Sequence, residues 1–191
     1  MLVNGMDAFL GNKGFHVPMV IHAKDGNSIR AVLLIGLKGY GKNLYTSQKC
    51  GLAFLNPMAA IVADMSPISL NKERGVAFYS LTFPIPEYPE LRGRILLFQW
   101  VVPGEGKRLS CSDIQGVLVR KREWLGPGNP VWNIKRRKSF PAQFERERDD
   151  GAVKTVALKM LIPFLKGVWG KDLVFGKRLE DLIEKMKKNV N

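Results

Sequence analysis

We expect an α+β fold, with a mostly antiparallel β-sheet over about residues 15–122 followed by a basic irregular segment and two C-terminal α-helices. Three observations predict it. The apolar segments of the first 120 residues are short, β-branched and separated by Gly, Pro and Asn. The region after residue 125 lacks a hydrophobic period, and beyond residue 151 apolar residues recur at helical spacing.

The length and composition predict one folded domain. A chain of 191 residues with 46% hydrophobic and 25% charged residues can bury enough apolar surface to fold without disulfide bonds. Within this single domain, residues 1–191, we distinguish a β-rich part (about 1–125), a basic loop segment (about 126–150) and a helical part (about 151–191).

The β-rich part contains two predicted hairpins. Residues 16–23 and 29–37 are apolar and are separated by Asp25-Gly26-Asn27, which is typical of a hairpin turn. Residues 94–102 and 114–122 form the second predicted hairpin. Between them, the three prolines of residues 83–89 predict an extended connection, because proline cannot donate to a strand ladder.

Two helices are predicted after residue 151. In residues 152–165 the apolar side chains follow the helical period, and Pro163 should kink or end the helix. In residues 177–188 one face is apolar and the other carries the pairs Asp181–Lys185 and Glu184–Lys188, four residues apart.

The net charge of +13 is unevenly distributed. Residues 1–90 hold 8 Lys/Arg and 6 Asp/Glu, whereas residues 91–191 hold 22 and 11. We expect the later cations to gather on a common patch, because a one-sided excess of charge attracts polyanions. Nucleic acid is the polyanion that we favour. A basic surface that serves only solubility is the alternative.

The densest basic stretch is interleaved with aromatic residues. Cations spaced along a surface neutralise phosphates and release counterions, and aromatic rings can stack on exposed bases. The predicted nucleic-acid-binding residues are Arg120, Lys121, Arg122, Trp124, Trp132, Lys135, Arg136, Arg137, Lys138 and Phe140. In the alternative interpretation the two tryptophans anchor the core, and the run of residues 135–138 is a nuclear import signal.

A glycine-rich segment raises an enzymatic hypothesis. Residues 36–42 match the spacing G-x-x-x-x-G-K after a predicted strand, and Asp64 ends an apolar strand as a Mg²⁺-supporting aspartate would. Asn43, however, stands where the Mg²⁺-binding hydroxyl belongs, and only 21 residues separate Lys42 from Asp64. Whether residues 36–42 bind phosphate stays open, with a glycine-rich hairpin loop as the alternative.

Metal and nuclease chemistry have weaker support. His16 and His22 share a strand face, but neither they nor Cys50 and Cys111 have the close spacing of a zinc site, so we expect no metal and no cofactor. A nuclease needs carboxylates that converge on a cation. The candidate acids Asp64, Glu73, Asp113 and Glu123 have no distinguishing spacing.

The hypothesis that the sequence favours is a non-enzymatic nucleic-acid-binding accessory or targeting protein, with DNA preferred. One alternative is a matrix-like structural protein that self-assembles or lies on an anionic membrane, using an exposed apolar loop at residues 83–88. The other is an enzyme, either a nuclease or a P-loop-like NTPase.

The expected location follows from two absences in the sequence. No signal sequence and no run of about 18 apolar residues is present, so we expect a soluble protein. It would be cytoplasmic or nucleoid-associated, or nuclear if the source is a eukaryote or a eukaryotic virus. The strandedness and sequence of the nucleic acid and the oligomeric state stay open.

Overall fold

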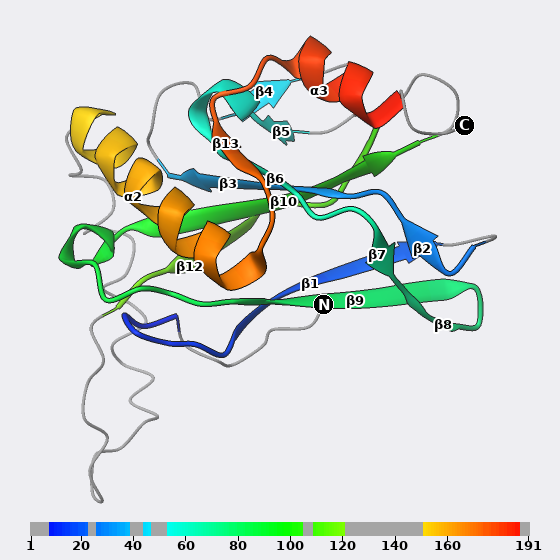
Figure 1. Ribbon diagram of the computed structural model, residues 1–191, viewed down its shortest axis with the longest axis horizontal. Coiled ribbons are helices and arrows are strands. Elements are labelled where there is room, and N and C mark those ends of the chain that lie inside the picture. Colours follow the sequence, from blue (N-terminus) through cyan, green and yellow to red (C-terminus); the bar gives the residue numbers. More distant parts are fainter. Residues whose placement is uncertain are drawn as a thin grey trace, which may run out of the picture.

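The described part of the chain has the predicted α+β class. The computed structural model describes residues 8–22, 26–38, 44–46, 53–104, 109–120 and 151–187. Its paired strands are antiparallel, and two α-helices follow in the C-terminal part (Figure 1).

A six-stranded sheet forms the centre of the molecule. Its strand order is β11-β10-β3-β6-β13, and β12 also pairs with β10. The bounds are β3 Val32–Leu37, β6 Ile61–Asp64, β10 Ile95–Pro103, β11 Leu109–Cys111, β12 Gln115–Leu118 and β13 Leu173–Phe175. β12 pairs with the first half of β10 and β11 with the last residues, so together they make one interrupted edge strand. The predicted pairing between the two segments of the second hairpin is confirmed for residues 95–98 and 115–118. Strand β11, which pairs with the end of β10, was not predicted.

The first predicted hairpin is wrong. β1 (Phe15–His22) pairs along its whole length with β9 (Val76–Phe83), whereas β3 pairs with β10 and β6. All six residues of β3 are buried, but β1 buries alternate residues. A strand that is apolar on both faces requires a covered sheet, while an alternating strand suits a sheet with one face in water.

The remaining strands are short. β8 (Asn71–Glu73) adds to β9 and completes the three-stranded sheet β1-β9-β8. Two ribbons pair β2 (Ser28–Ile29) with β7 (Ile68–Ser69), and β4 (Leu44–Thr46) with β5 (Ala53–Leu55). The 3-10 turns η1 (Pro57–Ala59) and η2 (Pro89–Leu91) lie in the connections.

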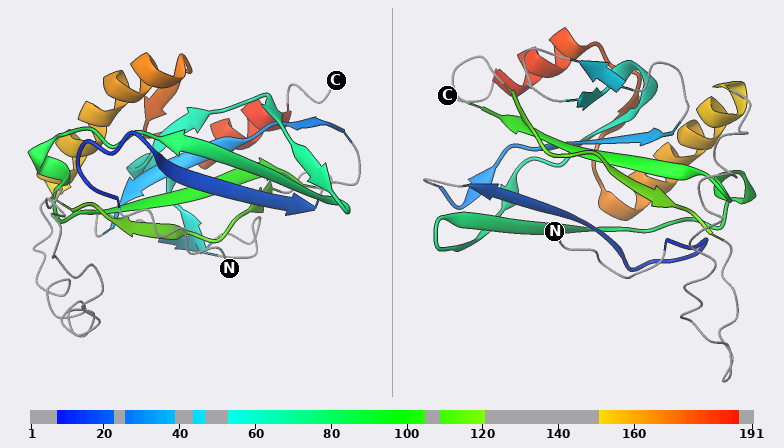
Figure 2. Two further views of the ribbon diagram at one scale, coloured as in Figure 1. Left: turned by 90° about the horizontal axis from the view of Figure 1, so that it is seen from below. Right: turned by 180° about the vertical axis from the view of Figure 1, so that it is seen from behind.

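The central sheet has a hydrophobic core on each face. One core lies between this sheet, the β1-β9-β8 sheet and α2 (Gly151–Trp169). The other core lies under α3 (Leu179–Lys187) and includes Leu55 of β5 (Figure 2). β10 contributes to both cores, because Phe98 and Trp100 face the first and Leu97 and Val101 face the second.

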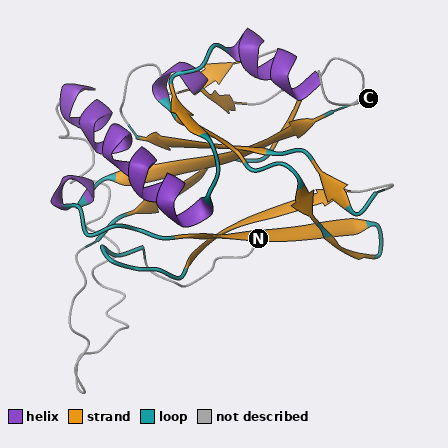
Figure 3. Ribbon diagram, viewed as in Figure 1, coloured by secondary structure: helices purple, strands orange, loops and turns teal. Residues whose placement is uncertain are grey.

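Both predicted helices are present, with one correction. α2 continues through Pro163 to Trp169, so the proline does not end the helix, which was one of the two expected outcomes (Figure 3). Pro163 lies on the exposed side of α2, where water can satisfy the carbonyl that loses its partner. Beyond it, Trp169 Nε1 donates to the carbonyl oxygen of Thr82 at 3.1 Å and holds the last turn against β9. The edge strand β13, between the helices, was not predicted.

The proline-rich connection is extended, as predicted, but it is not an exposed loop. Phe83, Pro84, Ile85 and Pro86 are buried. Ile85 N–H donates to the carbonyl oxygen of Asn12 at 2.7 Å, so this segment is paired with the N-terminal chain. The apolar loop that a membrane-binding interpretation required is therefore part of the core.

Gln99 is the one buried polar side chain among the described residues. Its Oε1 accepts the N–H of Leu55 at 2.7 Å, and its Nε2 donates to the carbonyl oxygen of Ser112 at 2.9 Å. This amide joins β10 to β5 on one side and to the break between β11 and β12 on the other.

We predict that Gln99→Met lowers the free energy of unfolding by about 2–4 kcal/mol, because each buried backbone group left without a partner costs about 1–3 kcal/mol. Urea unfolding followed by tryptophan fluorescence measures the change. The matched control is Gln115→Met at an exposed position of β12, where a change within about 0.5 kcal/mol is expected. Equal losses in the two variants would contradict the role of Gln99.

An ion pair joins α3 to the end of β6. Lys185 Nζ lies 2.7 Å from Asp64 Oδ2, and the N–H of Ser66 donates to Asp64 Oδ1 at 3.1 Å. Lys185 was expected to pair with Asp181 on its own helix, so this contact replaces the local one. Burial alone would raise the pKa of Asp64, but the hydrogen bonds from Lys185 and Ser66 outweigh it and leave this pKa below its usual value.

We predict that Asp64→Asn lowers the free energy of unfolding at pH 7 by about 1 kcal/mol or less, because water screens a pair whose Lys185 side chain is 42% exposed. The lowered pKa makes the folded state more stable above the unfolded value of about 3.9, and this gain is lost as the pH falls through the folded pKa. Unfolding curves should therefore converge below about pH 4. A difference that grows in acid would refute the assignment.

Candidate nucleic-acid interface

Arg120 is the one predicted site residue that the structure describes. It is exposed and follows β12. Its N–H donates to the carbonyl oxygen of Ala8 at 2.9 Å, and its own carbonyl oxygen accepts from Leu10 N–H at 2.8 Å. The other nine lie outside the described residues: Lys121, Arg122, Trp124, Trp132, Lys135, Arg136, Arg137, Lys138 and Phe140.

Two arginines that the sequence analysis missed lie in the backbone segment that pairs with the residues before Arg120. The N–H of Val119 donates to the carbonyl oxygen of Arg94 at 2.8 Å, and the N–H of Gly93 donates to the carbonyl oxygen of Val119 at 2.8 Å. The ladder between β10 and β12 thus continues past both strands, so the backbone of Arg92 and Arg94 lies next to that of Val119 and Arg120. Strand alternation puts the Arg94 side chain on the face of Val119 and the Arg120 side chain on the opposite face. We call Arg92, Arg94 and Arg120 the basic pole.

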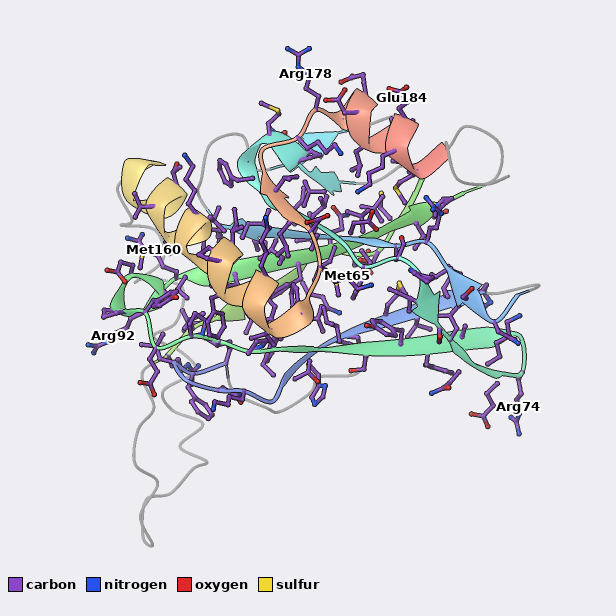
Figure 4. The ribbon with its side chains drawn as sticks, viewed as in Figure 1. Met65, Arg74, Arg92, Met160, Arg178 and Glu184 are labelled. Carbon is purple, nitrogen blue, oxygen red and sulfur yellow. The ribbon has the colours of Figure 1, made fainter. Side chains whose placement is uncertain are left out.

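The turn that presents the basic pole depends on glycine. Gly93 has φ +75°, a left-handed conformation that side chains rarely adopt, and a Cβ there would meet nothing within 4 Å. Arg92 is exposed and points away from the body of the molecule (Figure 4). The neighbouring carboxylate in the sequence is Glu90 of η2, which is also exposed. Glu87, which is also exposed, lies against Gly11, next to the Leu10 that pairs with Arg120, so three arginines and these two acids occupy this end of the molecule.

The other described cations of the second half lie elsewhere. Lys159 and Lys166 are exposed on α2, and Lys185 is paired with Asp64. Three more flank β13: Lys171, Lys177 and Arg178. The described cations thus do not form one continuous patch, and the basic pole is the group that adjoins the predicted basic segment.

The geometry contradicts the phosphate-loop interpretation. Gly36 is a buried residue within β3, where a Cβ would lie 3.0 Å from Leu55 Cδ2, so it does not begin a loop. β3 and β6 are antiparallel, and Asp64 pairs with Val32 at the opposite end of β3. A phosphate-binding loop and its Mg²⁺-supporting aspartate follow strands whose ends meet. Residues 39–43 lie outside the described residues.

The other enzymatic candidates do not converge in the described part of the chain. No three of its His, Cys, Asp and Glu side chains are grouped as a metal site requires. Asp64 ends β6, Glu73 ends β8 and Asp113 lies in the break between β11 and β12, while Glu123 is outside the described residues.

The histidine and cysteine side chains are likewise separate. His16 and His22 share the outer face of β1, as predicted, six residues apart. His16 Nδ1 lies 3.3 Å from Ser80 Oγ. Cys111 is half-buried at the end of β11, and Cys50 lies outside the described residues.

Comparison with known proteins adds no family. A scan against protein-family models and a search of curated protein sequences both find no match for this chain. The placement of its own residues is therefore the basis on which a function is inferred.

Proposed function

We propose that this protein is a non-enzymatic nucleic-acid-binding factor that grips the phosphate backbone with the basic pole and the cations that follow it in the chain. The observation that carries the proposal is the pairing of Arg94 with Val119. It brings the backbone of Arg92 and Arg94 close to that of Arg120, after which the basic segment follows in the sequence.

The charge of the adjoining segment supports the proposal. Residues 107–148 contain eleven Lys/Arg and four Asp/Glu. Each phosphate that a cation neutralises releases condensed counterions, which makes binding favourable and sensitive to salt. Arginine suits this task because its planar guanidinium stays charged and can form two parallel hydrogen bonds with a phosphate.

Aromatic residues in the same segment give the proposal a second component. Trp124, Trp132 and Phe140 stand among the cations in the sequence. Rings beside a positively charged groove bind unpaired bases by stacking, with little preference for base identity. A protein of this composition would bind single strands through stacking and backbone contacts, and duplexes through backbone contacts alone.

We predict that Arg92→Gln weakens duplex DNA binding equally on unrelated sequences. If six cations contact phosphates, the slope of log K against log salt is near −5, and losing one contact reduces its magnitude by about 0.9. Fluorescence anisotropy at several salt concentrations measures both quantities.

The control for this experiment is Arg74→Gln. Arg74 carries the same charge at the tip of the β8–β9 hairpin, at the other end of the molecule (Figure 4). The control removes the same net charge but should leave the slope unchanged. Equal effects of the two variants would mean that total charge is responsible. Absence of binding to duplex and single-stranded probes at 50 mM salt would refute the proposal.

We further predict that Trp124→Ala and Trp132→Ala each weaken binding to a single-stranded oligonucleotide by about 1–3 kcal/mol if the ring stacks on a base. Duplex affinity should change much less. Titration of both probes, with thermal unfolding as a check of the fold, separates stacking from structural damage. A variant that loses stability and affinity for both probes would identify that tryptophan as a core anchor.

A further inference from the structure

Helix α2 is unusually apolar for a helix at the surface. Its 19 residues include four polar side chains, Lys154, Thr155, Lys159 and Lys166, and no acid. A surface helix normally has one apolar face and one polar face. α2 instead has apolar residues on both faces.

One apolar stripe of α2 is buried in the protein. Ala157, Leu158, Leu161 and Leu165 are buried in the core between the central sheet and the β1-β9-β8 sheet. Phe164 packs edge-on against Tyr88, with ring centroids 6.1 Å apart, and Trp169 packs against Phe83 at 5.6 Å. These contacts fix which side of the helix faces outward.

A second apolar stripe occupies the outward side. Val156, Met160, Pro163 and Gly167 follow one another at intervals of four, three and four residues, which places them along one face of the helix. Val156 is 53% exposed, Pro163 is exposed and Met160 is partly exposed. A Cβ built on Gly167 would meet nothing within 4 Å, so among the described residues this face is open.

Lysines line one side of this outward stripe. Lys159 and Lys166 are exposed, two turns apart, and both lie next to the stripe. Lys159 Nζ also lies 5.7 Å from the centre of the Phe175 ring of β13. The helix lies at the outside of the molecule in all the views (Figures 1 and 2).

We propose that the outward face of α2, defined by Val156, Lys159, Met160, Pro163, Lys166 and Gly167, binds an anionic lipid surface. The apolar stripe would lie at the boundary between headgroups and acyl chains, and the lysines would contact the headgroups. Nucleic acid would match the lysines but leave the apolar stripe in water. A lipid surface matches both.

The geometry fits a helix that lies on a bilayer. α2 is about 28 Å long, and the buried residues of 157–165 attach it to the core, so the outward stripe would enter the membrane only to a shallow depth. No described helix has the combination of length and hydropathy that spanning a bilayer requires. The inference is independent of the proposed nucleic-acid binding, which uses the basic pole.

The test is flotation of the full-length protein with vesicles of phosphatidylcholine alone or with 30% phosphatidylserine. The protein should float with the anionic vesicles and not with the neutral ones. Lys159→Gln with Lys166→Gln should reduce the partition coefficient about 30-fold, from about fivefold per cation. The matched control, Lys72→Gln with Arg74→Gln, removes two charges from β8 and its hairpin and should retain binding.

A second pair of variants tests the apolar stripe. Val156→Glu should abolish flotation, whereas Val20→Glu should not, because Val20 is 58% exposed on the outer face of β1, away from α2. Near-UV circular dichroism checks that both variants are folded. If Val156→Glu does not fold, the Lys159→Gln, Lys166→Gln variant alone tests the lipid proposal.

Three results would overturn the inference. They are equal flotation with neutral and anionic vesicles, an equal loss of flotation in the Lys72→Gln, Arg74→Gln control, and unchanged flotation of the Lys159→Gln, Lys166→Gln variant.

Duplex binding distinguishes the lipid proposal from the nucleic-acid proposal. Arg92→Gln should weaken duplex binding and not flotation, and the lysine variant should do the reverse. If the lysine variant loses duplex affinity as much as flotation, α2 belongs to the nucleic-acid surface and the lipid assignment is wrong.

Discussion

The structure depends on strand β10, whose two faces are both buried and whose two edges are both hydrogen-bonded to other strands. Both of its faces are covered by a core, so both of its edges must be hydrogen-bonded, and β3 on one edge and β11 with β12 on the other provide this. Gln99 adds a polar contact within an apolar face and holds β5 and the break after β11 in place. Register along β10 therefore determines where the flanking segments lie.

The positions of both proposed surfaces, the basic pole and the outward face of α2, depend on the strands and core around β10. At the start of β10 the ladder to β12 extends to Arg94 and Val119, so the backbone of the basic-pole arginines is close together just before the basic segment of the sequence. On the first core, Trp169 and the buried leucines of α2 fix the rotation of the helix, so that its second apolar stripe faces outward. The two surfaces use different residues and different chemistry, which makes them separable by substitution.

The phosphate-loop hypothesis loses its support for a topological reason. Gly36 and Asp64 belong to the neighbouring strands β3 and β6, but these strands are antiparallel, so the two residues lie at opposite ends of the pair. Asp64 is instead engaged by Lys185 and Ser66, where it joins the last helix to the central sheet. A carboxylate that looked catalytic in the sequence is part of the structural framework.

The sequence by itself determined the features that depend on local order. Alternation and turn residues predicted the pairing of β10 with β12, the helical period predicted α2 and α3, and the prolines predicted an extended segment at residues 83–89. Of the candidate site, it identified Arg120 and the basic segment. The bounds predicted for the second hairpin contain Arg94, but the register that pairs Arg94 with Val119 came from the structure.

Only the tertiary structure decided what depends on distant partners. β1 pairs with β9, where one face of the strand is buried, as its alternating pattern requires. β13 pairs with the edge of β6 that β3 does not occupy. Pro163 is tolerated within α2 because it lies on the side of the helix that faces water. Residues 83–86 are buried in the core, although the sequence placed them in an exposed loop. Lys185 pairs with Asp64 of β6 and not with Asp181 of its own helix, because the tertiary fold brings Asp64 within reach. Burial and pairing between segments far apart in the chain have no signature in local periodicity.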